Sequence, residues 1–119
     1  SATAAVRDAL LAQIEVSHCG MLPATQLPAM LAVQQQRDRR MAERMIAAPK
    51  PAMLLAGAFH VRRDLGVPLH IEDLAGEPVG VLMLAEVGET VSAAQADYVW
   101  YTPAQPEQDH CEQLRQPRN

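Results

Sequence analysis

An unbroken apolar run, AMLLAGAF at residues 52–59, limits the folds open to this 119-residue chain more than any other feature. The run has the length of a strand, lacks the alternation of a half-buried strand and follows a long helical pattern. These properties favour a strand covered on both faces in a parallel sheet. Further strands are expected at about 79–87 and 97–102. We therefore expect an α/β fold with a small, mostly parallel sheet packed by helices.

Two longer helices are expected before this run, at about 4–17 and 26–47, and a short one at 68–76. One face of the second helix carries Leu27, Leu31, Gln34, Asp38, Met41 and Met45. This stripe is apolar at both ends and polar in the middle. Asp38 on a core-facing stripe is costly unless it is paired. Either it meets a partner, or the helix is rotated and its middle is solvated.

The predicted sheet is small for a chain of this length. We therefore expect residues 1–104 to form the C-terminal portion of a larger α/β domain, and residues 105–119 to form a polar tail that is irregular unless Cys111 anchors it. The beginning at Ser1, inside a helical pattern, is compatible with a leader or a longer segment before it.

Composition excludes some classes of protein and leaves others open. Hydrophobic residues make up 49% of the chain, enough for a packed core. The net charge of −4 argues against a general nucleic-acid binder. No apolar stretch approaches the roughly 20 residues of a membrane-spanning helix, so we expect membrane association only through a lipid anchor outside this chain.

The two cysteines each follow a histidine, in SHCG around Cys19 and DHCE around Cys111. One disulfide between them is expected if the protein is exported. Two free thiols are an alternative. A zinc site built from both His–Cys pairs has the right ligand types, although adjacent residues usually point in different directions.

The residues after the first predicted strand are the best candidates for a binding site. Ligands of open parallel sheets bind beyond the carboxyl ends of the strands, and His60 falls at that end. Gly57 would permit a close backbone approach or a bulge. Arg62 and Arg63 suit an anionic ligand, or else form local ion pairs in a solvated turn. Asp38 can reach the same rim from the long helix and orient His60 or an arginine.

Several catalytic signatures are missing from the chain. It has no phosphate-binding glycine loop and no GxSxG elbow, and neither His–Cys pair lies in a protease-like signature. Tyr98 and Tyr101 are expected to pack within the strand, although a phenolate oxygen is also a known ligand of ferric haem iron.

With these residues collected, the chain resembles the ChaN-like family of haem-binding uptake proteins. The matching stretches are HCG followed by LP, then QQQRDRRMAERM, LLAGAFHVRRDLGVP, DYVWYTP and the late cysteine. The family belongs to a wider group with the TIKI/TraB-like proteins and the erythromycin esterases, which share glycine–x–x–histidine motifs. Gly57 to His60 resembles the second such motif, and the first, Gly-Glu-x-His, is absent here.

The resemblance implies an α/β protein that binds haem in bacterial haem or iron acquisition, without catalysing a reaction. It implies a place in the cell envelope, in the periplasm or as an outer membrane lipoprotein. It also implies haem held in a homodimer, a tyrosine as iron ligand, and basic or histidine groups on the propionates. By position His60 is the matched residue, accompanied by Arg62 and Arg63. No tyrosine matches the iron ligand.

Two other functions remain open at this point. By analogy with the wider group, the chain is part of a metal- or histidine-dependent hydrolase, with His60 as ligand or base and Asp38 as its orienter. Alternatively, it is an interaction piece whose exposed apolar surface pairs with a second copy or with the missing N-terminal half of the domain.

Overall fold

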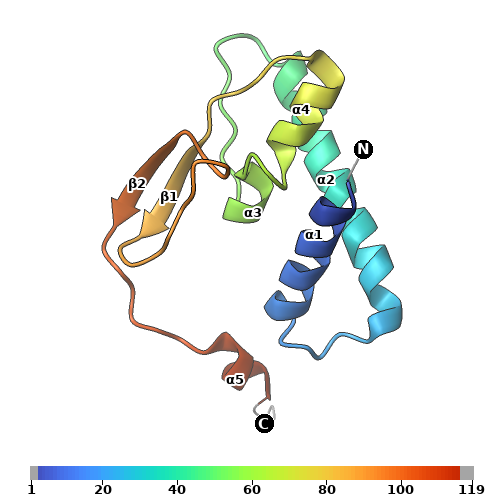
Figure 1. Cartoon of the computed structure of the whole chain (residues 1–119), viewed down its shortest axis with the longest axis vertical. Coiled ribbons are helices and arrows are strands. Elements are labelled where there is room, and N and C mark those ends of the chain that lie inside the picture. The colour runs from blue at the N-terminus through green and yellow to red at the C-terminus, as the bar shows by residue number, and fades with distance from the viewer. Residues whose placement is uncertain (1–2, 116–119) are drawn as a thin grey trace.

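The computed structural model describes residues 3–115 and builds them from helices that pack beside a small sheet (Figure 1). In chain order the elements are α1 (Ala4–Ser17), a 3-10 turn η1 (Ala24–Gln26), α2 (Leu27–Ala47), α3 (Ala58–Val61), α4 (Val67–Ala75), β1 (Leu82–Glu86), β2 (Tyr98–Thr102) and α5 (His110–Arg115). Ser1 and residues 116–119 of the expected tail lie outside the described residues.

The two strands pair in parallel, with Leu82 opposite Tyr98 and Glu86 opposite Thr102. This pairing confirms the predicted α/β class and its small parallel sheet. On β1, Met83 faces the interior together with Val81, which lies just before the strand, and Ala96 closes this small core from the β1–β2 connection. The sheet therefore has one packed face, formed where β1 meets α3.

The strand expected at 52–59 does not form, and this prediction was wrong. Residues 52–57 are extended but have no ladder partner among the described residues, and Ala58 to Val61 turn into the one-turn helix α3. The expected cover on both faces is also missing, since Met53 is 84% and Leu55 86% exposed. Backbone hydrogen bonds define a strand, so an apolar run without a neighbouring strand remains an extended segment.

The helices are joined by two small apolar cores. Leu10 and Ile14 of α1 pack against Leu31 of α2 and Leu65 of the α3–α4 turn. A second cluster joins α2 to α4 through Ala42, Val67 and Ile71. Each core takes residues spaced by three or four along its helix, as an amphipathic pattern predicts. Leu65 thus holds the α3–α4 turn against helices α1 and α2.

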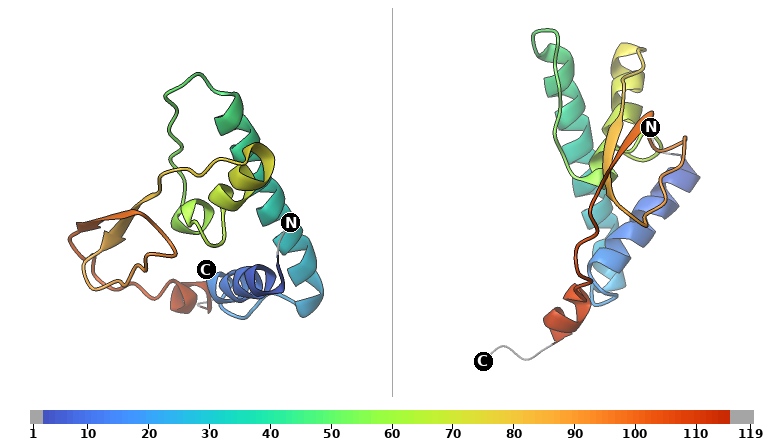
Figure 2. Two further views of the ribbon diagram at one scale, coloured as in Figure 1. Left: turned by 45° about the horizontal axis from the view of Figure 1, so that its top comes forward. Right: turned by 90° about the vertical axis from the view of Figure 1, so that its left-hand side faces the viewer.

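The C-terminal segment was expected to be irregular unless Cys111 anchored it, and Cys111 does anchor it. It forms α5, and Cys111 in its first turn is bonded to Cys19 just after α1. Figure 2 shows α5 beside the end of α1, at the far side of the molecule from the top of α2. The alternative of two free thiols therefore does not hold in this structure.

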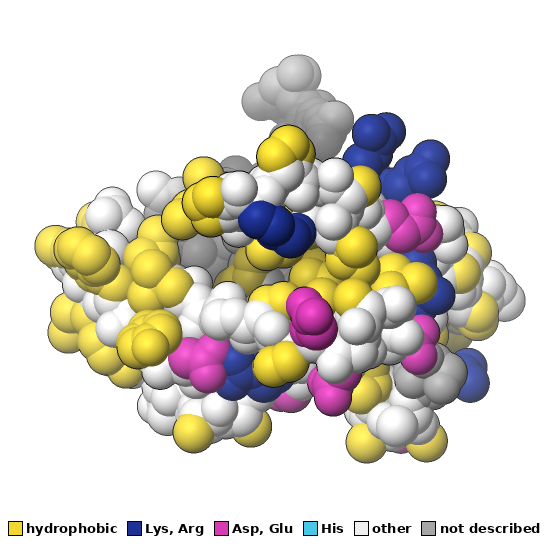
Figure 3. Space-filling model, turned by 90° about the horizontal axis from the view of Figure 1, so that it is seen from above, with side chains coloured by type: hydrophobic (Ala, Val, Ile, Leu, Met, Phe, Trp, Pro, Cys, Tyr) yellow, Lys and Arg dark blue, Asp and Glu magenta, His cyan; other side chains and the backbone are white. Residues whose placement is uncertain are grey.

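The outer face of the sheet is exposed and apolar. Tyr98 is 69% and Trp100 65% exposed, and they lie in register with the exposed Leu82 and Leu84. Figure 3 shows hydrophobic side chains gathered around a hollow on the upper side of the molecule. The expectation that Tyr98 packs within the strand was therefore wrong, because nothing among the described residues covers this face.

Candidate functional site

The clearest polar pair in the structure joins α2 to α3. Nδ1 of His60 lies 2.5 Å from Oδ1 of Asp38, across 22 residues of sequence. The Asp38 side chain is fully buried, whereas that of His60 is 29% exposed. With the carboxylate as acceptor, Nδ1 donates the hydrogen, so Nε2 is the ring nitrogen left for a ligand.

Asp38 is buried because the stripe of α2 that carries it faces the core. Leu31, two turns before it, and Ala42, one turn after it, are buried on the same helix. Of the two sequence interpretations of this stripe, the core-facing one is therefore correct. Oδ2 of Asp38 is buried and has no hydrogen-bond partner among the described residues. A half-satisfied buried carboxylate is costly, which is unusual unless it serves a site.

Burial raises the pKa of Asp38 above its ordinary value of 3.8, and the hydrogen bond from His60 opposes this rise. The folded state therefore binds this proton more tightly than the unfolded state. Protonation of Asp38 therefore contributes to the free energy of unfolding. This contribution is fully present below pH 3.8 and is lost as the pH rises through the folded-state pKa of Asp38.

We expect the Asp38 carboxyl carbon to titrate above 3.8 in carbon-13 NMR spectra. Asp97 serves as an internal control, because its hydrogen bonds from Arg63 and from a backbone N–H hold its pKa below 3.8. In Asp38→Asn, this part of the pH dependence of the unfolding free energy should disappear. An Asp38 midpoint at or below that of Asp97 would contradict the expected burial effect.

The two arginines after His60 are both engaged in ion pairs. Arg62 forms a two-pronged pair with Asp64, through Nε at 2.9 Å and Nη2 at 2.6 Å, and its guanidinium lies over the Phe59 ring. Arg63 pairs with Asp97 and donates to the Val79 carbonyl. Arg63 thus ties the α3–α4 turn to the sheet, while Arg62 keeps its Nη1 group for another acceptor.

The glycine that matters to the backbone is Gly66 rather than Gly57. Gly57 caps α3 with an ordinary φ of −61°, and a Cβ there would meet only the His60 ring at 3.6 Å. A Cβ on Gly66 would instead lie closer than 3.0 Å to the carbonyl oxygens of Phe59 and His60. The close backbone approach expected at Gly57 is therefore found at Gly66. The α3–α4 turn brings the backbone of Gly66 against the carbonyl groups of Phe59 and His60.

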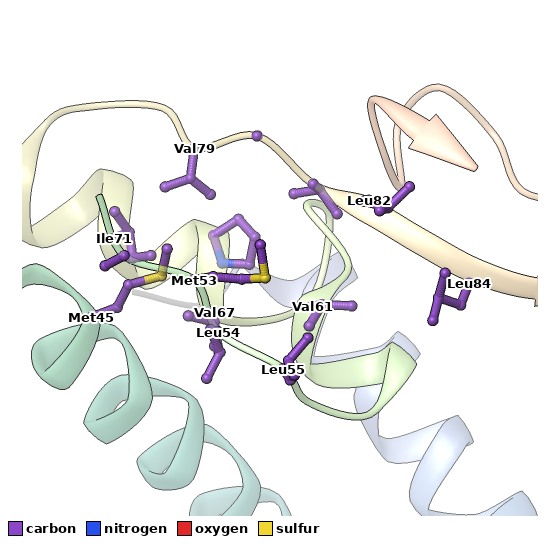
Figure 4. Close-up of a pocket in the computed structure, with 14 residues that line it drawn as sticks. Met45, Met53, Leu54, Leu55, Val61, Val67, Ile71, Val79, Leu82 and Leu84 are labelled. Carbon is purple, nitrogen blue, oxygen red and sulfur yellow. The ribbon is translucent and has the colours of Figure 1, made fainter. Parts of the chain in front are cut away.

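An apolar pocket of about 300 Å³ lies between the extended segment and the start of the sheet (Figure 4). Its fourteen lining residues are all apolar or glycine, and they include Met53, Leu55, Val67, Ile71, Leu82 and Leu84. Val61 also lines it, so the residue after His60 faces the pocket. This volume lies at the lower end of the range for small-molecule sites, and the lining suits an apolar ligand.

The structure therefore brings together some of the predicted site residues. Asp38 and His60 are in direct contact, and Arg62 and Arg63 follow on the next turn. Two contributing residues, Gly66 and Asp97, were not singled out from the sequence. Asp97 is 34 residues from its partner Arg63, so no local pattern indicates the pair.

Comparison with known proteins identifies the family. A family model described as haem-binding uptake, Tiki superfamily, ChaN matches residues 1–71, which include both Asp38 and His60. The chain belongs to the ChaN family. The resemblance seen in the sequence is thereby confirmed.

A solved structure described as cofacial heme binding to ChaN of Campylobacter jejuni is similar to this ChaN-like chain. The two are 33% identical, with a TM-score of 0.72 over 83% of this chain. The match covers 39% of that protein, so the present chain spans well under half of its length. The comparison with curated proteins gave no match. No helix in residues 3–115 is long and apolar enough to cross a membrane.

Proposed function

We propose that this chain binds haem as part of bacterial haem or iron uptake. The observation that carries the proposal is the Asp38–His60 pair, which leaves Nε2 of an oriented imidazole for a ligand, within the stretch that matches the family model. Val61, the residue after His60, lines the apolar pocket. Haem needs both features, because its macrocycle is apolar and its propionates and iron are polar.

The residues present fit haem in part. The pocket lining and the exposed faces of Leu82, Leu84 and Trp100 suit the macrocycle. Tyr98 is exposed on β2, on the same face as Trp100, and offers a phenolate oxygen of the kind that ligates ferric iron, whereas Tyr101 lies on the other face. Haem bound here would supply an iron centre and two propionate carboxylates. The described residues that line the pocket are apolar or glycine, so none of them can ligate the iron or pair with a propionate.

We assign the haem propionates to His60 and Arg62, which form the rim of the proposed site. Nε2 of His60, oriented through Asp38, donates to one propionate when the imidazole is protonated. The Nη1 group of Arg62 remains available beside it, because Asp64 occupies Nε and Nη2. Arg63 supports the rim by holding the α3–α4 turn on the sheet. Gly57 begins the helical turn that carries His60.

Haem binding is tested by titrating the oxidised chain with hemin and following the Soret band. We expect saturable binding, and we expect His60→Ala to weaken it by at least about tenfold, the equivalent of one hydrogen bond to a charged group. The Soret maximum of the bound haem should stay in place, because His60 does not ligate the iron in this proposal. His70→Ala is the matched control and should bind as the parent does.

The outcomes separate the parts of the proposal. No saturable Soret change in the parent chain would end the haem-binding function. A shifted Soret band and altered electron paramagnetic resonance spectrum in His60→Ala would place His60 on the iron instead of a propionate. Loss of the phenolate signature in Tyr98→Phe would identify Tyr98 as the iron ligand.

Haem also accounts for the exposed sheet face if two copies share it. A flat macrocycle lying on Leu84 and Trp100 leaves its other face in water, and a second copy would cover that face. We therefore propose a haem-dependent homodimer. Sedimentation of the titrated sample is the readout. The mass should double with haem and stay that of one chain without it, and an unchanged mass would remove the dimer from the proposal.

The disulfide supports a place in the cell envelope. Disulfides persist in oxidising compartments such as the periplasm and the cell surface, and Cys19 and Cys111 are bonded. Haem uptake takes place at the same boundary. We also propose attachment to the outer membrane as a lipoprotein.

A further inference from the structure

A second cluster of reactive side chains is formed by Cys19, His110 and Cys111. It joins α5 to the end of α1, and these two elements lie away from α3 in the fold (Figure 1). Nε2 of His110 lies 3.7 Å from the sulfur of Cys19 and 3.8 Å from that of Cys111. All three ligand atoms lie within 4.8 Å of one another. The haem-binding proposal makes no use of this cluster.

The spacing of the histidine nitrogen from the two sulfurs suits a metal ion, whereas the sulfurs are bonded to each other and must first separate. In a tetrahedral zinc site with Zn–S bonds of about 2.3 Å and Zn–N bonds of about 2.0 Å, the nitrogen lies about 3.6 Å from each sulfur. His110 already stands close to that separation from both cysteine sulfurs. Two thiolates and one imidazole are also ligand types that zinc prefers.

We propose that reduction of the Cys19–Cys111 disulfide turns this cluster into a Cys₂His site for Zn²⁺, with the fourth position open to water. The metal would then join α5 to α1 in place of the disulfide. The proposal does not depend on haem binding.

The chemistry has two steps. A dithiol donor is oxidised to its own disulfide, and each cysteine sulfur gains one electron and one proton as the S–S bond breaks. Zn²⁺ then displaces both thiol protons to solvent and bonds the two thiolates and the lone pair on Nε2 of His110. His110 must carry its hydrogen on Nδ1 for this step, and it gives up its 3.4 Å contact with the Ser17 carbonyl.

The ligands on α5 are held in part without the disulfide. The Asp109 carboxylate accepts the backbone N–H groups of Cys111 and Glu112 at 3.0 and 3.1 Å, which fixes the first turn of α5. His18 is placed differently, because its Nδ1 lies 2.8 Å from the Ile14 carbonyl at the end of α1. A site using both His–Cys pairs is therefore not the geometry observed.

Cobalt(II) is the first probe. The chain is reduced with a phosphine, the excess is removed, and Co²⁺ is added without oxygen. We expect thiolate-to-cobalt charge-transfer bands and tetrahedral ligand-field bands that saturate at one ion per chain and bleach when Zn²⁺ is added, with two protons released per zinc. The oxidised chain should show none of these bands.

His110→Ala and His18→Ala form the matched pair of variants. Losing even a group that only supports a metal ligand costs about 10–100-fold in affinity, so His110→Ala should bind cobalt at least about tenfold more weakly. His18→Ala, which removes a histidine next to Cys19, should bind as the parent does. His110 is exposed, so its truncation leaves the fold intact, and circular dichroism checks this.

Three results would overturn the proposal. One is a reduced parent without charge-transfer bands. Another is equal cobalt affinity in His110→Ala and the parent, which would leave only a pair of thiols. The third is the same cobalt binding by the oxidised chain, since both sulfurs would then be unavailable.

Discussion

Gly66→Ala is expected to destabilise the chain by about 3 kcal/mol, at the upper end of the range for overpacked sites. The added methyl group would meet the backbone carbonyls of Phe59 and His60, which cannot move aside as a flexible side-chain tip can. The φ of −114° at Gly66 is ordinary, so the cost arises from space and not from backbone conformation. Urea unfolding followed by circular dichroism measures the effect.

Gly57→Ala is the matched control for this substitution. It adds the same methyl group nine residues earlier, where the nearest atom is 3.6 Å away, and should change stability by no more than about 0.5 kcal/mol. If Gly66→Ala unfolded at the same urea concentration as Gly57→Ala, the close approach of the α3–α4 turn to the His60 carbonyl would be disproved.

Removing the disulfide is expected to lower the free energy of unfolding by about 2–5 kcal/mol. Cys19 and Cys111 are 92 residues apart, and a cross-link over so long a loop strongly restricts the unfolded chain. The folded state loses little in comparison, because α5 contains no buried residue. Urea unfolding of the Cys19→Ser/Cys111→Ser double variant against the oxidised parent gives the difference.

Reduced parent protein in the presence of a chelator is the control for the double variant. It has the same sequence as the oxidised chain but no cross-link and no bound metal, so it should match the double serine variant in stability. Equal unfolding midpoints in the oxidised parent and the double variant would show that the long loop does not carry the expected stabilisation.

The sequence was sufficient to predict what depends on local pattern. The helix around α4 could be placed because Pro68 fits a first turn and Gly76 takes the left-handed conformation that ends a helix, with φ of 69°. The strand β1 lies within the short apolar stretch in which a strand was predicted, at about 79–87. The prediction of a strand at 52–59 failed, because an apolar run does not reveal whether another strand lies beside it.

Most residues of the candidate site could be predicted from the sequence, but most of their contacts could not. Asp38 stood out as a charge on an apolar stripe, and His60 as a histidine after an apolar run, so their meeting was a testable expectation. The partner of Arg63 was not predictable, because Asp97 is far away in sequence. Gly66 was not predictable either, because the need for a residue without a Cβ arises from the nearby His60 carbonyl and not from the local sequence.

The Cys19–Cys111 bond also makes most of the chain a covalent ring. Two exposed stretches without regular structure lie inside that ring, at residues 52–57 and 103–109. A protease that cuts either stretch opens the ring but releases no fragment, because the disulfide still links the two pieces. They separate only when the disulfide is reduced. A nicked molecule would therefore keep α1 and α5 joined after its backbone had been broken.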